Sequence, residues 1–289
     1  MRNSIPLLVA LLSVCPAARP APAQESPLPQ TWEYVDAMRT VAAKSHGRPG
    51  VVIHVGDSIT YANPYGGYAR YGKAHTDEDN AALKWMHAGA NDDADGWHLA
   101  AFDHPDGGRS YTAAGGVRAD EMLAGGKAHL PPFKDLLDTY KPQIVVLMLG
   151  TNDASASRPV EAFRADMLTC VDLMLERGIV PILSTIPPHV HKLELSKSYN
   201  EAMRELAKEK HLPLIDFEKE ILLRRPNDWD GTLLNKGDVH PTASRAGAEP
   251  TSEPTPENLK NSGYLLRGWL SLKKIEEVKG QVFDPVKPK

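Results

Sequence analysis

Four short apolar runs stand out along the chain, each set apart by polar or helical sequence. They are rich in Val, Ile and Leu, which is typical of strands buried on both faces of a sheet. Pro181 and Pro213 lie within two of the runs, and a strand tolerates proline only at an edge or at its start. We therefore predict strands at residues 51–55, 144–149, 179–183 and 212–215.

The segments between these runs place apolar residues at helical spacing. Gly47 and Gly178 are stop signals for two of these helices. Strands and helices that alternate along a chain form a parallel sheet with helices on both faces, so the expected fold class is α/β. The spacing predicts helices over about residues 31–45, 160–174, 195–207 and 263–278.

Three stretches show neither the apolar runs of strands nor the apolar spacing of helices. Residues 61–109 mix Gly, Asp, Asn and His, and are predicted as an irregular insertion. A connection of this length in a compact domain is often functional. Residues 243–259 are predicted as a second irregular loop, and the polar, Pro-rich residues 24–30 as a mobile leader. The rest of the pattern is continuous, and we expect a single domain over residues 24–289.

The first 23 residues are organised like a secretory signal peptide. Arg2 supplies the positive start, residues 5–15 are apolar, and residues 21–23 offer the small side chains that signal peptidase reads. A short helix belonging to the fold is the alternative, but the Pro/Ala-rich stretch that follows argues against it. Cys15 suggests a lipoprotein site, although Val14 is larger than the residue expected before such a cysteine. The expected location is secreted or periplasmic.

Charge, hydrophobic runs and cysteine content argue against a nucleic-acid partner, a membrane span and a cysteine nucleophile. The chain has 33 basic and 37 acidic residues, and loss of Arg2 and Arg19 with the signal peptide leaves 31 basic residues and a net charge of −6. A mildly acidic chain without a basic stripe does not fit a nucleic-acid partner. No run approaches the roughly 18 apolar residues that a membrane span needs. Cys170, the one cysteine left, falls in an apolar helical pattern typical of an inert buried thiol.

Polar clusters follow three of the predicted strands. Asp57 and Ser58 come directly after the first strand, Asn152 after the second, and His240 after the last. In parallel α/β sheets, ligands bind outside the carboxyl ends of the strands. A serine nucleophile needs a base, for which histidine suits neutral pH, and donors that face the developing oxyanion. Ser58, His240 and Asn152 are candidates for these three roles.

These clusters resemble the sequence blocks of the SGNH, or GDSL-type, hydrolases. Residues 56–60, Gly-Asp-Ser-Ile-Thr, are similar to the first block, which contains the nucleophilic serine. Residues 150–153, Gly-Thr-Asn-Asp, match the third block, and residues 240–241, His-Pro, match the end of the last. The blocks occur in family order over most of the chain. The resemblance implies a three-layer α/β/α sandwich with a flavodoxin-like parallel sheet of about five strands.

The resemblance also implies an oxyanion hole built from Ser58, a glycine and Asn152. The family's glycine block often begins with Asn and ends in Gly followed by a small polar pair, whereas residues 112–118 read Thr-Ala-Ala-Gly-Gly-Val-Arg. Gly116 is the expected oxyanion glycine, with Gly115 as the alternative.

The acidic member of the triad departs from the family's pattern. The family usually places an aspartate three residues before the histidine, where this chain has Gly237. Asp238, two residues before His240, is the expected partner. Asp230 or a backbone carbonyl is the alternative, and the latter would leave a Ser–His dyad.

The function that the resemblance implies is a serine ester hydrolase working through an acyl-enzyme. The sequence has no Gly-rich phosphate loop, dinucleotide fingerprint or zinc spacing, so we expect no cofactor or metal. Expected export and the polar, aromatic insertion favour O-acetyl groups on carbohydrates, or similar small esters, as substrates. A lipase or thioesterase of the same family is one alternative. A secreted carbohydrate-binding protein that has lost its chemistry is another, which the displaced aspartate favours.

Several other residues have structural interpretations. His189 and His191 have no acidic or cysteine partner nearby in sequence, so we expect a substrate loop or solvent contact rather than a metal site. Asp153 is expected to cap a helix or brace a loop, and His54 to lie in the core. Four aromatic residues either line a sugar-binding cleft or form the core of the insertion: Tyr61, Tyr65, Trp85 and Trp97.

Overall fold

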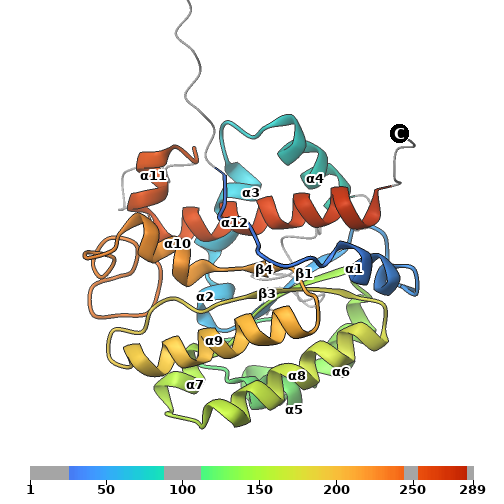
Figure 1. The fold of residues 1–289 in the computed structure, drawn as a ribbon, viewed down its shortest axis with the longest axis horizontal. Coiled ribbons are helices and arrows are strands. Elements are labelled where there is room, and N and C mark those ends of the chain that lie inside the picture. Colours follow the sequence, from blue (N-terminus) through green and yellow to red (C-terminus); the bar gives the residue numbers. More distant parts are fainter. Residues whose placement is uncertain (1–25, 88–111, 244–252, 285–289) are drawn as a thin grey trace, which may run out of the picture.

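A parallel sheet of four strands forms the centre of the computed structural model, which describes residues 26–87, 112–243 and 253–284 (Figure 1). The strands are neighbours in chain order, and every one of their residues is buried. Val52 pairs with Ile144, which in turn pairs with Val180. This confirms the strands predicted from the apolar runs. They are β1 (Val52–Gly56), β2 (Ile144–Met148), β3 (Val180–Ser184) and β4 (Leu214–Ile215).

Pro181 is tolerated in β3, although β3 has neighbours on both sides. The Val180 amide donates to Gln143 on the β2 side, and the Leu183 amide donates to Pro213 on the β4 side. Because backbone amides alternate in direction, position 181 faces the β4 side, where pairing begins only at Leu183. A missing N–H at this point breaks no ladder hydrogen bond.

A fifth strand was expected, and the described residues show a single bridge in its place. Gly56 donates to Thr112 O and accepts from Ala114 N, both at 3.2 Å, on the free edge of β1. If this bridge is counted as a strand, the sheet order is 2-1-3-4-5, the doubly wound order of flavodoxin-like folds. The chain reverses its winding direction beside β1, which is where such folds bind ligands.

Helices cover both faces of the sheet and confirm the three-layer α/β/α sandwich (Figure 1). Helices α8 (Val160–Glu176) and α9 (Leu193–Glu209) lie on one face, and α1 (Val35–Ala42) and α12 (Gly263–Val278) on the other. The buried side of α8 comprises Phe163, Met167, Cys170, Val171 and Met174, which recur at the helical period. Cys170 is buried as predicted.

Shorter helices complete the described chain. On the same side as α8 lie α5 (Ala119–Ala124), η3 (Lys127–His129), α6 (Phe133–Tyr140) and α7 (Thr151–Ser155). After β4 the chain forms α10 (Phe217–Arg224), α11 (Pro256–Asn261) and, at its end, η4 (Lys279–Phe283). None of the helices in the described ranges is long and apolar enough to cross a bilayer.

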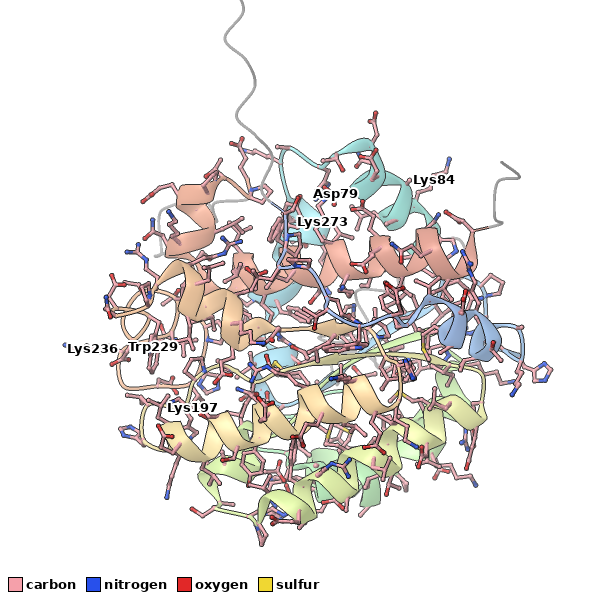
Figure 2. The ribbon with its side chains drawn as sticks, viewed as in Figure 1. Asp79, Lys84, Lys197, Trp229, Lys236 and Lys273 are labelled. Atoms are coloured by element: carbon pink, nitrogen blue, oxygen red, sulfur yellow. The ribbon has the colours of Figure 1, made fainter. Side chains whose placement is uncertain are left out.

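The prediction of an irregular insertion was wrong for its described part. Residues 58–87 form α2 (Ser58–Tyr61), η1 (Asn63–Gly66), α3 (Gly67–Tyr71) and α4 (Asp77–His87). Asp79 of α4 is fully buried and lies 3.0 Å from the ammonium of Lys273 on α12 (Figure 2). This ion pair attaches α4 to the closing helix. Trp97 and the rest of the insertion lie outside the described residues.

The N-terminal leader was also mispredicted, since residues 26–32 lie along the edge of β4. The Gln30 side chain donates to Leu212 O at 3.0 Å and accepts from Leu214 N at 2.9 Å. It therefore supplies the hydrogen bonds that a neighbouring strand would supply and protects the edge. The predicted signal peptide, residues 1–23, lies outside the described residues.

Candidate active site

Three segments meet at the carboxyl edge of the sheet, beside the point where its winding reverses. Ser58 is the first residue of α2, directly after β1, and Asn152 lies in α7, directly after β2. His240 lies in the loop that follows α10. The sheet therefore places the residues that the sequence singled out in one region.

A continuous hydrogen-bonded series joins three of them. The Ser58 hydroxyl oxygen lies 2.8 Å from Nε2 of His240. On the other side of the ring, Nδ1 lies 2.9 Å from Oδ1 of Asp238 and 3.0 Å from its Oδ2. This is the arrangement of a nucleophile, a base and the group that orients the base.

A tight loop brings Asp238 and His240 together. The amide of Asp238 donates to Asn235 O, and the amide of Asn235 donates to His240 O, each at 2.9 Å. Gly237 has φ 72°, a left-handed conformation that favours glycine. This compact turn presents Asp238 to the ring although the two residues are only two positions apart.

Asp230 occupies a different role. Its Oδ1 accepts a 2.7 Å hydrogen bond from the Gly237 amide and thus braces the turn from outside. Of the two candidate carboxylates, Asp238 is the one within hydrogen-bonding distance of His240. Partial burial acts to raise the pKa of Asp238, but hydrogen bonds from His240 and the Val239 amide hold that pKa below its usual value. Asp238 is therefore a carboxylate at neutral pH.

Asp57 braces the turn at Ser58, and its hydrogen bonds within the described residues do not include His240. It caps α2, accepting from the Ile59 amide at 3.0 Å, and it also accepts from Nδ2 of Asn152 at 3.3 Å. Burial raises the pKa of this fully enclosed carboxyl, while the Ile59 amide and Arg267 act to lower it. Asp57 thus ties the end of β1 to the start of α7.

Candidate oxyanion donors surround the same point. The Ser58 amide is the first of α2, where a helix leaves N–H groups without partners within the helix. Gly116 has φ 73°, and within the described residues the amides of Gly115 and Gly116 donate to no acceptor. Asn152 Nδ2 donates to Val117 O at 3.0 Å as well as to Asp57, so it also anchors the glycine loop.

Lys127 fixes the glycine loop from the opposite side. Its ammonium donates to Gly116 O at 2.6 Å and to Oε2 of Glu121 at 2.9 Å. The sequence pattern did not single out this residue, because it stands in a short segment with no helical period. Its position beside a candidate oxyanion glycine makes it part of the site's framework.

Asp153 has the bracing role expected for it. This fully buried carboxylate accepts from the Ala119 amide, at the start of α5, and forms an ion pair with Arg158. It therefore joins α7 to the helix that follows the glycine loop and does not face Ser58.

Two histidines follow β3, and one of them contacts the loop that contains Asp238 and His240. His191 Nε2 lies 3.2 Å from Gly237 O, and His189 Nε2 lies 3.0 Å from Oγ of Ser155. Burial, and then the neighbouring His191, lowers the pKa of His189. Within the described residues no group of three or more His, Cys, Asp or Glu side chains is arranged to hold a metal ion.

The aromatic residues proposed for a sugar-binding cleft separate into two groups. Tyr65 is buried and bonded to His54 Nδ1 and Ser271, each at 2.9 Å, and Trp85 packs against Phe283. Tyr61 is 41 % exposed and lies on the helix that Ser58 begins. Of these four aromatic residues, Tyr61 is therefore the described one whose side chain is exposed. His54 lies in the core as expected.

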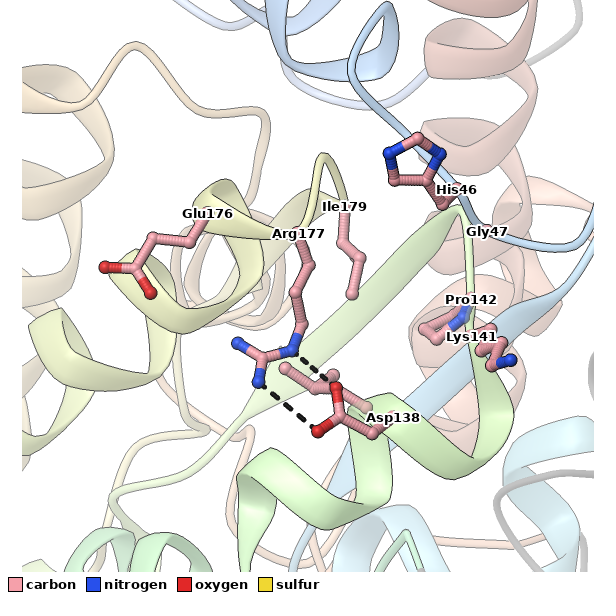
Figure 3. A pocket seen from close by; sticks show the side chains of 9 residues that line it. His46, Gly47, Asp138, Lys141, Pro142, Glu176, Arg177 and Ile179 are labelled. Carbon is pink, nitrogen blue, oxygen red and sulfur yellow. Dashed lines mark hydrogen bonds and ion pairs between the residues drawn. The ribbon is translucent and has the colours of Figure 1, made fainter.

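A cavity of about 480 Å³ lies at the opposite edge of the sheet, among residues that precede the strands (Figure 3). Pro142 stands before β2 and Ile179 before β3, and both line it. On its rim, Arg177 donates to both carboxylate oxygens of Asp138, at 2.8 and 3.4 Å. The length of the strands separates this cavity from Ser58, so it does not belong to the candidate site.

A family model and a curated relative match parts of this chain. The family model described as "GDSL-like Lipase/Acylhydrolase family" matches residues 54–244, which contain all the candidate site residues. An arylesterase from Vibrio mimicus is 25 % identical over 136 residues, 46 % of this chain. The chain spans 64 % of the length of that relative.

Two similar solved structures are described as a lipolytic protein and as an esterase. A putative lipolytic protein of the G-D-S-L family from Desulfitobacterium hafniense is 20 % identical, with 77 % of this chain and 98 % of that chain covered and a TM-score of 0.47. A catalytic mutant of an acetylxylan esterase from Geobacillus stearothermophilus is 15 % identical, with 80 % and 94 % covered and a TM-score of 0.48. Since the family model covers well over half of the sequence, the chain belongs to the GDSL-like lipase/acylhydrolase family.

Proposed function

We propose that this protein is a carboxylic ester hydrolase whose nucleophile is Ser58. The Ser58 oxygen attacks the ester carbonyl carbon while His240 Nε2 takes the hydroxyl proton. The tetrahedral intermediate then collapses, and the leaving alcohol takes that proton from His240. Water, deprotonated by the same ring, attacks the acyl-enzyme and releases the acid and free Ser58.

The Ser58–His240–Asp238 series is the observation that carries this proposal. Its two links, at 2.8 and 2.9 Å, already have the lengths that proton transfer requires. The ionised Asp238 favours the tautomer of His240 that carries its proton on Nδ1 and leaves Nε2 free to accept. These contacts weigh against the reading of the chain as a binding protein without chemistry.

The oxyanion of the intermediate is assigned to three donors: the amides of Ser58 and Gly116 and the side chain of Asn152. Asn152 donates to Val117 O and Asp57 in the structure described here, so we propose that it exchanges one of these acceptors for the substrate oxygen. Donors held in place before the reaction stabilise the developing charge most effectively.

Small esters, and O-acetyl groups on carbohydrate in particular, are the proposed substrates. Four large apolar side chains are exposed within the described residues, and only one of them, Tyr61, lies on the nucleophile's helix. A long acyl chain would need a larger apolar approach, whereas a sugar ring packs on a single exposed aromatic face. We also propose export, on the basis of the signal-peptide pattern in residues 1–23.

Hydrolysis of p-nitrophenyl acetate by wild type and Ser58→Ala tests the reaction. We expect the substitution to remove nearly all activity, and a fluorophosphonate to add its mass to wild type but not to the variant. Equal hydrolysis by both proteins would refute the proposal. Release of acetate from acetylated xylo-oligosaccharides, compared with cleavage of p-nitrophenyl palmitate, tests the substrate class, and a preference for palmitate would favour a lipase. Mass analysis of the mature N-terminus tests export.

A further inference from the structure

A buried arginine lies behind the nucleophile's helix. Arg267 belongs to α12, more than 200 positions away in sequence, and is 2 % exposed. Its guanidinium donates to Ile59 O and to Oγ1 of Thr60, both at 2.7 Å, and lies 3.8 Å from the centre of the Tyr65 ring. All its contacts on α2 are therefore made within two residues of Ser58.

The charge of Arg267 is buried beside the carbonyl end of α2. A buried charge is costly unless hydrogen bonds and an opposite charge compensate it. Asp57, also fully buried, stands at the N-terminal end of α2, and Arg267 binds the carbonyl side of the same single turn. A carboxyl oxygen that accepts from the first amides of a helix and a cation at its carbonyl end both favour the helical turn. Asp57 and Arg267 therefore hold α2 from its two ends.

Thr60 transmits this restraint to the strand before the nucleophile. Its hydroxyl lies so close to Gly56 that a Cβ on this glycine would be 2.2 Å from Oγ1. Arg267 thus holds Thr60 against the end of β1, and Ser58 stands between these two contacts. A turn of four residues has few internal hydrogen bonds, so contacts from outside determine its orientation.

We propose that Arg267 is a positioning residue for the nucleophile: through Ile59 O and Thr60 Oγ1 it fixes the turn that aims the Ser58 hydroxyl at His240 and the Ser58 amide at the oxyanion. The inference rests on the proposed function, because it assigns the positioned group as the nucleophile. A purely structural role, in which Arg267 only fills the core beneath α12, is the competing explanation.

Substitutions at Thr60 separate the two explanations with little change in volume. Thr60→Val removes one of the two acceptors of Arg267 on α2, the Thr60 hydroxyl, and Thr60→Ser keeps it. We expect Thr60→Val to lower kcat for p-nitrophenyl acetate by about tenfold, with KM within about twofold, because a small misplacement of a reacting group is costly. The rate of Ser58 labelling by a fluorophosphonate should fall in parallel, and Thr60→Ser should restore both rates.

Arg267→Lys, and a control that loosens α12 from another neighbour, complete the test. A lysine lacks the planar fork whose two nitrogens donate to the two acceptors, so we expect a similar loss of kcat, and no greater loss in the double variant with Thr60→Val. Asp79→Asn breaks the ion pair between α4 and Lys273 of α12, away from the contacts of Arg267 with α2 (Figure 2). It should lower the melting temperature without lowering kcat.

Each outcome decides between the explanations. Three results would overturn the positioning role. The first is a wild-type kcat in folded Thr60→Val, and the second is a loss of kcat in Thr60→Ser equal to that in Thr60→Val. The third is the same loss of kcat in Asp79→Asn. If Arg267→Lys does not fold, the two Thr60 variants still decide. Full activity in Ser58→Ala would instead refute the proposed function, whatever the Thr60 variants show.

Discussion

Oδ1 of Asp238 lies 2.9 Å from Nδ1 of His240, two positions further along the chain. The family's usual spacing of three residues is shortened by one, and the left-handed Gly237 turns the chain so that the carboxylate still faces the ring. The aspartate has moved in sequence but keeps the contact that a base needs.

Asp238→Asn tests whether this contact orients the base. Loss of the carboxylate removes the preference for the tautomer with its proton on Nδ1, and we expect kcat to fall about 100-fold or more. Steady-state kinetics on p-nitrophenyl acetate measures the loss. Asp230→Asn is the matched control, since an amide oxygen still accepts from Gly237, and it should keep kcat near wild type. Comparable losses in both variants would mean that the turn, and not the charge on Asp238, is what matters.

Asn152→Ala should affect the transition state more than binding. Removal of one oxyanion donor lowers kcat by about 100- to 1,000-fold, and KM should change little. Because Asn152 also donates to Asp57 and Val117, the melting temperature is expected to fall by a few degrees as well. If kcat stays at the wild-type level while stability falls, the side chain is only a brace.

Lys127→Met should lower kcat by about tenfold, because the Gly116 carbonyl loses the donor that fixes the glycine loop. Lys127→Arg keeps a donor and is expected to recover most of the rate. Glu121→Gln removes the other charge that Lys127 contacts and leaves the bond to Gly116 in place, so its kcat should remain high. Kinetics of the three variants on one substrate check the prediction, and a loss confined to Glu121→Gln would contradict it.

Tyr61→Ala is expected to raise KM for acetylated xylo-oligosaccharides by about three- to tenfold, through loss of one aromatic packing surface. Ethyl acetate, which has no sugar ring to pack on an aromatic side chain, should be hydrolysed as by wild type. Tyr71→Ala removes a side chain that is also exposed but lies on α3, and it serves as the control. Unchanged KM values in Tyr61→Ala would remove the structural support for a carbohydrate substrate.

The sheet could be predicted from sequence because parallel strands buried on both faces are continuous apolar runs. That Ser58, Asn152 and His240 lie at one edge of the sheet was also predictable, since they follow strands and match short family blocks. The fifth strand was not recovered, and a single bridge at Ala113 stands in its place. That segment has too few apolar residues to give a pattern.

The helices of residues 58–87 were missed for two physical reasons. Three of them have four or five residues, and two of these contain Gly at or near their ends, so no period can develop. The fourth, α4, begins with three acidic residues, and one of them, Asp79, faces the core because Lys273 pairs with it. Arg267 gave no local signal either, because its partners lie at the other end of the chain.

His54 gives a prediction about stability rather than catalysis. Burial first, and then the positive charges of Arg267 and Arg70, lower the pKa of His54 well below 6.5. The ring therefore stays neutral in the folded protein at pH values where it takes up a proton in the unfolded chain. Its effect on the free energy of unfolding is constant above pH 6.5 and becomes unfavourable below it.

His54→Asn should flatten this dependence, since an amide bonds Tyr65 in place of Nδ1 and does not titrate. A buried neutral histidine lowers the free energy of unfolding by about 1.4 kcal/mol for each pH unit below its unfolded pKa. Urea unfolding of wild type and variant at several pH values from 7.5 to about 5 measures the two slopes. His189, whose pKa burial also lowers, contributes equally to both proteins, so the difference in slope isolates His54. Parallel slopes would mean that His54 takes up its proton in the folded core.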